Sequence, residues 1–430
     1  MKATKILAAA AIFSLATAGS ALAFHSGGVA ECEGCHSMHN SFEGSANVTG
    51  MAQYQSGPYL LKANDQSGAC LNCHEAGAGS YHISTAGINQ YDSTTPVQMT
   101  SGGDFAWLKK TMTGVTRGNT VTYPGERHGH NIIAQDFGYV EDSTLTAAPG
   151  GTYPAANLAC SSCHDPHGRY RRFADGSQAT TGLPIFNSGS YTNSNNPTAG
   201  VSAVGVFRIL AGVGYQPKSV TGSLAFGNPA PDAVAKSSYN TASTSTTVAA
   251  NQYDLVAYGQ GMSEWCANCH TAMHNDTYTS GTPGLVHPAG NDANLTADIA
   301  SNYGAYVSSG IMTGTGANYS ALAPFEIGTN DYTVLKAFPT TPTAASTSNN
   351  VNCLSCHRAH ASAFESMARY YLGSEFMTIA DSGNAAIYDT SGKVEGYTTT
   401  TQLTNAYNGR QATVFGPYAR NYCNKCHAKD

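Results

Sequence analysis

All twelve cysteines of this 430-residue chain fall into six copies of the pattern Cys-x-x-Cys-His. Two thiols at this spacing can form thioether bonds to the vinyl groups of one porphyrin, and the adjacent histidine can bind the iron as its proximal ligand. The pattern therefore predicts six covalently bound haem c groups. The six motifs are Cys32-Cys35-His36, Cys70-Cys73-His74, Cys160-Cys163-His164, Cys266-Cys269-His270, Cys353-Cys356-His357 and Cys423-Cys426-His427.

Two other uses of the cysteines have to be weighed. Twelve cysteines in an exported protein could form six disulfides, and paired Cys-x-x-Cys units could hold zinc. Neither use requires a histidine after every pair, and no cysteine is left over outside the six motifs. We therefore interpret all six motifs as haem attachment sites.

Nine histidines lie outside the motifs, and six irons with two histidines each need six of them as distal ligands. In a chain so rich in haem motifs, we expect most of these histidines to bind iron. His128 is the weakest candidate, because the run Glu126-Arg127-His128 suggests exposure to solvent and His130 competes for the same place. The distal candidates are His25, His39, His82, His130, His167, His274, His287 and His360.

Four of the candidates closely follow a proximal histidine. His39, His167 and His360 come three residues after one, and His274 comes four residues after His270. Side chains at these spacings point to the same side of a helix, so such a histidine cannot reach the far face of its own haem. We expect it to bind the iron of a second haem beside the first, with ring edges about 4 Å apart.

The N-terminus has the pattern of a secretory signal peptide over residues 1–23. Lys2 and Lys5 precede an apolar stretch, and Ala21-Leu22-Ala23 resembles a cleavage site. We expect residues 24–430 to form one hexahaem domain outside the cytoplasm, with no membrane span after cleavage. Only 11% of the residues are charged and the net charge is −6, and a surface with so few charges favours self-association. The sequence has no run of basic residues of the kind that binds nucleic acid.

Regular secondary structure is expected to be sparse. The motifs follow no fixed period, and polar stretches at 187–198, 237–247 and 340–350 are interpreted as surface loops. Short helices are expected at the motifs, short strands at 204–209 and 253–258, and a longer helix after the fifth motif, from Ala359 to Tyr371 before Gly373. The predicted fold is mostly coil with short helices and few short strands, wrapped around a chain of stacked haems.

Several segments resemble one family, the OmcS-type hexahaem outer-surface cytochromes of Geobacter. The resemblance lies in residues 24–36, 160–168, 259–270, 351–360 and 423–430, and it covers essentially the whole mature chain. It implies polymerisation into a conductive extracellular filament, with electrons passing to acceptors such as iron oxides. It also implies that His39 binds a haem of the adjacent subunit and that redox partners lie at the cell envelope.

The function indicated by these observations is electron transfer without chemistry on a substrate. Two histidines on each iron leave no open coordination position, so we expect no catalytic residue and no enzyme activity. One alternative is a soluble periplasmic multihaem shuttle. The other is a multihaem reductase, which would need an open iron, often marked by Cys-x-x-Cys-Lys; that motif does not occur in the sequence.

Overall fold

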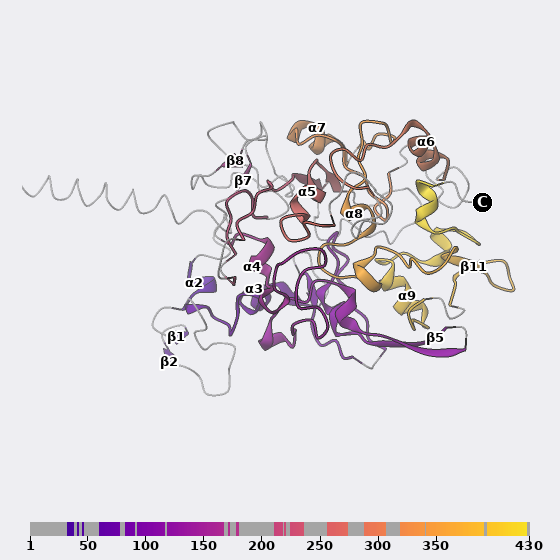
Figure 1. The fold of residues 1–430 in the computed structure, drawn as a ribbon. Helices are drawn as coiled ribbons and strands as arrows, with labels where there is room; N and C mark the ends of the chain where they lie inside the picture. The colour runs from indigo at the N-terminus through magenta and orange to yellow at the C-terminus, as the bar shows by residue number, and fades with distance from the viewer. Residues whose placement is uncertain are drawn as a thin grey trace, which may run out of the picture.

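A computed structural model gives the fold of most of the chain (Figure 1). It describes residues 32–37, 41–42, 45–46, 60–77, 82–90, 93–116, 118–166, 171–172, 178–179, 210–217, 219–220, 224–235, 256–273, 288–306, 319–339, 341–390 and 394–427. The signal peptide, the predicted strand at 204–209 and the polar stretches 187–198 and 237–247 lie outside the described residues. So do five distal candidates, namely His25, His39, His167, His274 and His287.

The helices in the described part of the chain are short. They are α2 (Cys32–Cys35), α3 (Gln66–His74), α4 (Cys160–Cys163), α5 (Met262–Cys266), α6 (Ala297–Tyr306), α7 (Tyr332–Ala337), α8 (Cys353–Cys356) and α9 (Thr400–Ala406). Single 3₁₀ turns lie at Phe105–Lys109, Gly125–His128, Gln135–Phe137, Ala155–Asn157, Glu365–Met367, Ala412–Val414 and Tyr422–Lys425. No helix in these residues is both long and apolar enough to cross a membrane.

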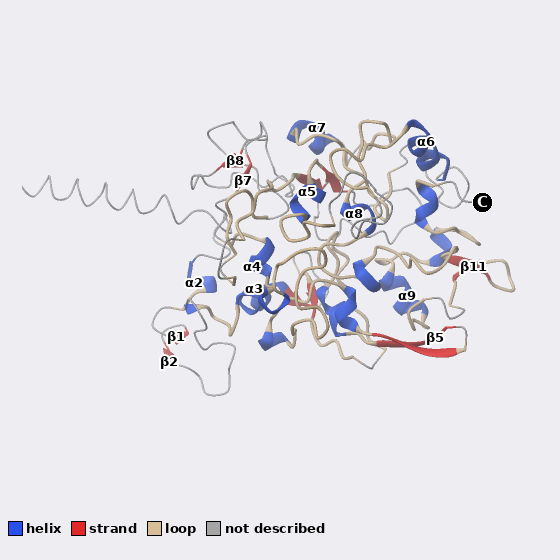
Figure 2. Ribbon diagram, in the orientation of Figure 1, coloured by secondary structure: helices blue, strands red, loops and turns tan. Residues whose placement is uncertain are grey.

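The strands pair only two at a time within the described residues. The longest pair is the antiparallel hairpin of β5 (Met112–Thr116) and β6 (Asn119–Tyr123). The other antiparallel pairs are β1 (Ser41–Phe42) with β2 (Ser45–Ala46), β7 (Arg171–Arg172) with β8 (Gln178–Ala179), β9 (Ala233–Ala235) with β10 (Val256–Tyr258), and β11 (Thr378–Ala380) with β12 (Ala386–Tyr388). β3 (Glu75–Ala76) and β4 (Ser84–Thr85) are parallel. Long loops connect these elements (Figure 2), which confirms the mostly coil fold.

The six motifs coincide with helical turns, as the sequence predicts. α2, α4 and α8 each begin at the first cysteine of a motif, and α3 and α5 end within one. In α4 and α8 the residue before the second cysteine is a serine, and its hydroxyl accepts the backbone N–H that precedes the helix: Ser162 from Ala159 at 2.9 Å, and Ser355 from Asn352 at 3.1 Å. This contact satisfies an N–H that a four-residue helix leaves without a partner.

The helix predicted over residues 359–371 is wrong. Only the 3₁₀ turn Glu365–Met367 forms there, and Ser366 has a left-handed backbone with φ of 56°. The backbone of this segment pairs with other parts of the chain: His360 N–H donates to the Gly102 carbonyl at 2.8 Å, and Ser362 N–H to the His128 carbonyl at 2.9 Å. The predicted strand at 253–258 is partly confirmed by β10, and 341–350 is a loop whose last two residues are buried.

Aromatic side chains form much of the two larger apolar clusters. One joins β9, β10, α7 and the start of α8 around Tyr258, Tyr319 and Phe325. The other joins residues after the fifth motif to α9, where the rings of Tyr388 and Tyr407 stack at 4.8 Å. Both clusters include residues next to the motifs, so the packing of the protein fixes where the motif helices lie.

Candidate haem sites

The first, third and fifth motifs share one local structure. In each, the histidine after the helix forms an antiparallel β-bridge: His36 with Leu61, His164 with Leu210, and His357 with Ala368. The residue that follows each bridge partner then donates its backbone N–H to the carbonyl of the second cysteine of the motif. The three bonds are Lys62 to Cys35 at 2.9 Å, Ala211 to Cys163 at 2.9 Å, and Arg369 to Cys356 at 2.7 Å. A bridged backbone has little freedom, so the main chain of each of these three histidines is held in place.

The motifs also dock against one another in pairs. The N–H of Cys160, the first cysteine of the third motif, donates to the Ser67 hydroxyl on α3 at 3.1 Å. The N–H of Cys353 donates in the same way to Ser263 on α5, also at 3.1 Å. α3 thus lies against α4, and α5 against α8 (Figure 1). In both cases the serine lies three residues before the first cysteine of the even-numbered motif. This spacing is present in the sequence, but its role in docking two motifs is recognised only from the structure.

The remaining neighbours complete a row in sequence order. The first and second motifs are joined through Lys62, whose carbonyl accepts from the Asn72 side chain at 2.9 Å. The third and fourth motifs are joined through His130 and His360, because the N–H of His130 donates to the carbonyl of His360 at 2.9 Å. The His130 ring faces His270 of the fourth motif, and the His360 ring faces His164 of the third. The fifth and sixth are joined by Tyr370 and Tyr422, whose rings lie 5.3 Å apart.

Three histidine rings are oriented by backbone carbonyls. The Nδ1 atoms of His270, His357 and His130 lie 2.8, 2.7 and 2.8 Å from the carbonyl oxygens of Pro149, Ser366 and Ala359. A carbonyl oxygen only accepts, so Nδ1 carries the proton and Nε2 keeps its lone pair. This is the usual arrangement of histidines that bind metal through Nε2.

Two pairs of imidazoles face each other at a separation that fits a metal between them. The ring centres of His130 and His270 lie 6.1 Å apart, and those of His164 and His360 lie 6.3 Å apart. Two imidazoles that bind one metal at about 2.0–2.1 Å have ring centres about 6.3 Å apart. Each pair joins a proximal histidine to a distal candidate, so the residues fit a bis-histidine haem.

Glycines allow the His360 segment to lie between two loops. Ala361 forms β-bridges to both Gly103 and Gly129. A Cβ atom at Gly103 would lie 1.8 Å from the Ala361 carbonyl oxygen, and one at Gly129 would lie 2.5 Å from the Ala361 Cβ. Gly103 also has a φ of 94°, a conformation that other residues rarely adopt. These close approaches bring His130 and His360 together across a large separation in sequence.

The two distal imidazoles are held neutral. Burial, with smaller contributions from the neighbouring His270 and His357, lowers the pKa of His130 to about 4. Burial likewise lowers the pKa of His360 to about 3, with further contributions from His164, His130 and His74. Only a neutral imidazole can bind metal, so both rings are in the form that iron requires at neutral pH.

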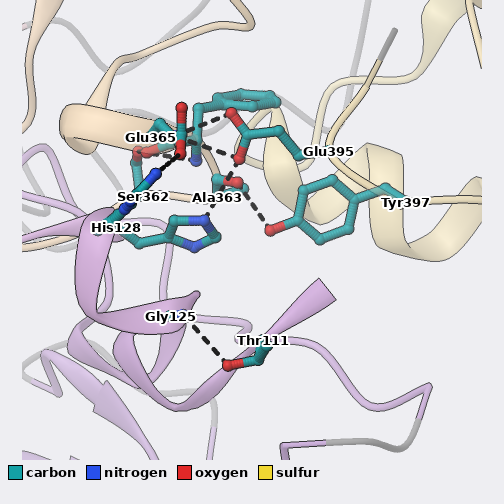
Figure 3. A network of polar contacts seen from close by, with 10 residues as sticks. Thr111, Gly125, His128, Ser362, Ala363, Glu365, Glu395 and Tyr397 are labelled. Carbon is teal, nitrogen blue, oxygen red and sulfur yellow. Dashed lines mark hydrogen bonds and ion pairs between the residues drawn. The ribbon is translucent and has the colours of Figure 1, made fainter. Parts of the chain in front are cut away.

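His128 is not exposed to solvent, contrary to the interpretation of its charged sequence context. It is fully buried, and its Nε2 atom lies 3.3 Å from the Glu395 carboxylate (Figure 3). The same carboxylate accepts the N–H of Glu365 at 3.0 Å, and nearby the Tyr397 hydroxyl donates to the Ala363 carbonyl at 2.7 Å. The His128 ring therefore packs beside the Glu395 carboxylate, whereas the His130 ring faces His270 of the fourth motif.

His82 and His427 are the remaining described site residues. His82 is half-buried, and Ile83, which follows it, donates its N–H to the His74 carbonyl at 3.0 Å. His427 is exposed and lies two residues after the end of the last 3₁₀ turn. None of the described cysteine side chains forms a disulfide; they are Cys35, Cys70, Cys73, Cys160, Cys163, Cys266, Cys269, Cys353, Cys356, Cys423 and Cys426.

Most of the motif thiols lie against other motifs. A hydrogen bond with Cys160, together with burial, holds the pKa of Cys70 well above its ordinary value, and a hydrogen bond with Cys353 raises the pKa of Cys266 in the same way. Each contact joins an even-numbered motif to the next odd-numbered one, in agreement with the serine contacts above. Within the described residues, no group of three or more His, Cys, Asp or Glu could by itself hold a metal ion.

Comparison with known proteins shows the family to which the chain belongs. It is 57% identical to the C-type cytochrome OmcS of Geobacter sulfurreducens, over 100% of this chain and 99% of the relative. The chain belongs to the OmcS family of c-type cytochromes. No family model matches it.

Two solved structures of OmcS resemble the fold. The OmcS nanowires of Geobacter sulfurreducens, determined by cryo-electron microscopy, give a TM-score of 0.83 at 56% identity. An OmcS filament from the same organism gives a TM-score of 0.83 at 57% identity. Each comparison covers 95% of this chain and 100% of the other, so the OmcS fold extends over nearly all of the sequence.

Proposed function

We propose that this chain carries six bis-histidine haem c groups and polymerises into an extracellular filament that conducts electrons to acceptors such as iron oxides. Haem c supplies reversible one-electron exchange at its iron when bound. The chain contributes the attachment cysteines, the axial imidazoles and a scaffold that places neighbouring groups next to each other. The observation that carries the proposal is the pairing of imidazoles from remote segments at the separation that one iron requires.

The ligand pairs follow from these contacts. His270 and His130 would hold the fourth haem, and His164 and His360 would hold the third. Because the backbones of His130 and His360 are hydrogen-bonded, the third and fourth haems would be neighbours. The serine contacts bring the second motif to the third and the fourth to the fifth, so the six sites would form one uninterrupted row.

Polymerisation would continue this row from one subunit to the next. The family resemblance implies that His39 binds a haem of the adjacent subunit, and the structures of OmcS are filaments. His39→Ala should therefore shorten or abolish filaments as well as leave one haem without its distal ligand. Normal filaments with every haem low-spin in this variant would contradict that role for His39.

Electron transfer without catalysis is the form of activity that we propose. The neutral, buried imidazoles of His130 and His360 would close the sixth positions of two irons. A reductase would instead leave one position open. Tight binding of carbon monoxide to one haem of the reduced wild-type protein would favour the enzyme, and absence of such binding would favour the conduit.

Electron microscopy of cell-surface material and haem analysis test the proposal directly. We expect filaments that contain this chain, six thioether-bound haems per chain and a fully low-spin absorption spectrum. A monomeric haem protein would support a shuttle instead, and fewer than six haems would show that some motifs serve another purpose.

A further inference from the structure

The third and fifth motifs have the same backbone but different charges around it. In the third motif, the carbonyls of Ser161 and His164 accept from the Tyr215 hydroxyl at 2.6 and 3.2 Å. In the fifth, the carbonyls at the same two positions, Leu354 and His357, accept from Arg369 Nε at 2.6 and 3.0 Å. A neutral hydroxyl at one site is thus replaced by a guanidinium cation at the other.

The residue that follows the proximal histidine differs in the same direction. It is Asp165 in the third motif and Arg358 in the fifth, and both are almost completely buried, at 3% and 1% exposed. Two of the Arg358 contacts are hydrogen bonds from Nη1 to the carbonyls of Thr100 and Ser101, at 3.3 and 3.0 Å. The third motif therefore has a buried carboxyl group and the fifth a buried guanidinium at equivalent positions.

The charge of Arg369 is poorly compensated by the described protein. The guanidinium is 1% exposed, and its partners are the carbonyls of Leu354, His357 and Ala321 and the hydroxyl of Tyr258. Within the described residues, no carboxylate lies within ion-pair distance of it. Its charge lies directly against the fifth motif, because Arg369 Nε donates to two carbonyl groups of that motif.

A second cation strengthens this field. Arg358, Arg369 and Arg410 are all buried, with at most 2% of each exposed. Arg410 is linked to Arg358 through Asn408, whose side chain donates to the same Thr100 carbonyl that accepts from Arg358. The guanidinium group of arginine keeps its proton in folded proteins. Buried cations interact strongly with a charge that changes nearby, because little water screens them.

We propose that Arg358 and Arg369 hold the haem of the fifth motif at a higher reduction potential than the haem of the third, where Asp165 and Tyr215 take their places. This inference rests on the proposed function. An oxidised bis-histidine haem carries one more positive charge than its reduced form, so buried cations favour reduction and a carboxylate favours oxidation. When an electron passes to the fifth site from a neighbour, one iron is reduced and the other oxidised, with no proton or bond exchanged.

The haems along the row would therefore differ in reduction potential. Of two otherwise similar bis-histidine sites, the fifth would retain an electron longer than the third. The motif pattern alone predicts six equivalent centres, because the difference comes from Arg369 and Tyr215, which lie outside the motifs.

Redox titration of assembled filaments, followed by haem absorbance, tests the inference. In Arg369→Gln, about one-sixth of the absorbance change, one motif of six, should move to lower potential. We expect at least a tenfold drop in the reduced-to-oxidised ratio of that haem at fixed potential, which corresponds to about 59 mV. Arg369→Lys retains the charge and should restore most of the wild-type curve.

Two further variants separate charge from structure. Tyr215→Phe removes the equivalent hydrogen bonds at the third motif without removing a charge, so it should leave the titration nearly unchanged. Asp165→Asn should move a different one-sixth of the absorbance change, and it should move it in the opposite direction, to higher potential. In the double variant Arg369→Gln, Asp165→Asn, the two shifts should add, because they belong to different haems.

The outcomes distinguish this inference from the proposed function. If the wild-type protein lacks six low-spin haems, the proposed function fails before any variant is measured. If six are present and neither Arg369→Gln nor Asp165→Asn shifts a potential, the inference is wrong and the function stands. Should Arg369→Gln fail to mature, Asp165→Asn decides alone, and an unchanged titration of that variant overturns the inference.

Discussion

Replacing His360 with alanine is the sharpest test of the ligand pairs. The His360 ring lies 6.3 Å from that of His164 and stacks on Phe105 with ring centres 4.6 Å apart. Its removal would leave His164 as the only axial imidazole of the third haem. Since the chain has six motifs, about one-sixth of the haem should become high-spin.

The same change removes packing as well as a ligand. Loss of a ring stacked on Phe105 should lower the free energy of unfolding by about 2–4 kcal/mol, within the range for large-to-alanine substitutions. His360→Met replaces the ring with another side chain that can bind iron. It should keep the haem low-spin and raise its potential.

Absorption spectroscopy and carbon monoxide binding measure the effect. The reduced His360→Ala protein should bind about one carbon monoxide molecule per chain, while the wild-type protein should bind none tightly. His128→Gln is the matched control, because His128 is buried two residues from His130 but lies against Glu395 rather than another imidazole. A fully low-spin His360→Ala protein, or a high-spin haem in His128→Gln, would refute the reasoning from ring separations.

Two further predictions concern the scaffold. Ser67→Ala and Ser263→Ala each remove an acceptor for a motif N–H and should lower the free energy of unfolding by about 1 kcal/mol in thermal melts, while Ser382→Ala, at an exposed serine, should have little effect. Burial, and then the Glu264 carboxylate, raises the pKa of Glu326 to about 8 from 4.5. Its contribution to stability is therefore complete below about pH 4.5 and is lost as pH rises through 8. Glu326→Gln should flatten the melting temperature across that interval, and an unchanged slope would argue against this assignment.

The motif helices could be predicted because covalent chemistry requires them. Two cysteines three residues apart share one face of a helical turn, and the structure has such turns at the motifs. The scarcity of other regular structure was also predictable from composition. These features depend on residues close together in sequence, where patterns are informative.

Residues 359–371 show where such prediction stops. Their apolar residues recur at helical spacing, but Ala361 is bridged by Gly103 on one side and Gly129 on the other. Those partners lie more than 200 residues away, and nothing in the local pattern announces them. His128 was misjudged for a related reason. The turn Gly125–His128 leaves Arg127 exposed and turns His128 inward to Glu395, a residue from another part of the chain.

Remote pairing also explains how a chain with so little regular structure can hold its shape. Its described sheets have two strands each, and isolated hairpins of this kind are marginally stable in water. An iron shared by His130 and His270, or by His164 and His360, would close a loop of more than 100 residues, where a crosslink restricts the unfolded chain most. The bonds from the distal histidines to the irons would therefore also stabilise the fold. Loss of a distal ligand should lower the free energy of unfolding and change the reduction potential of that haem together.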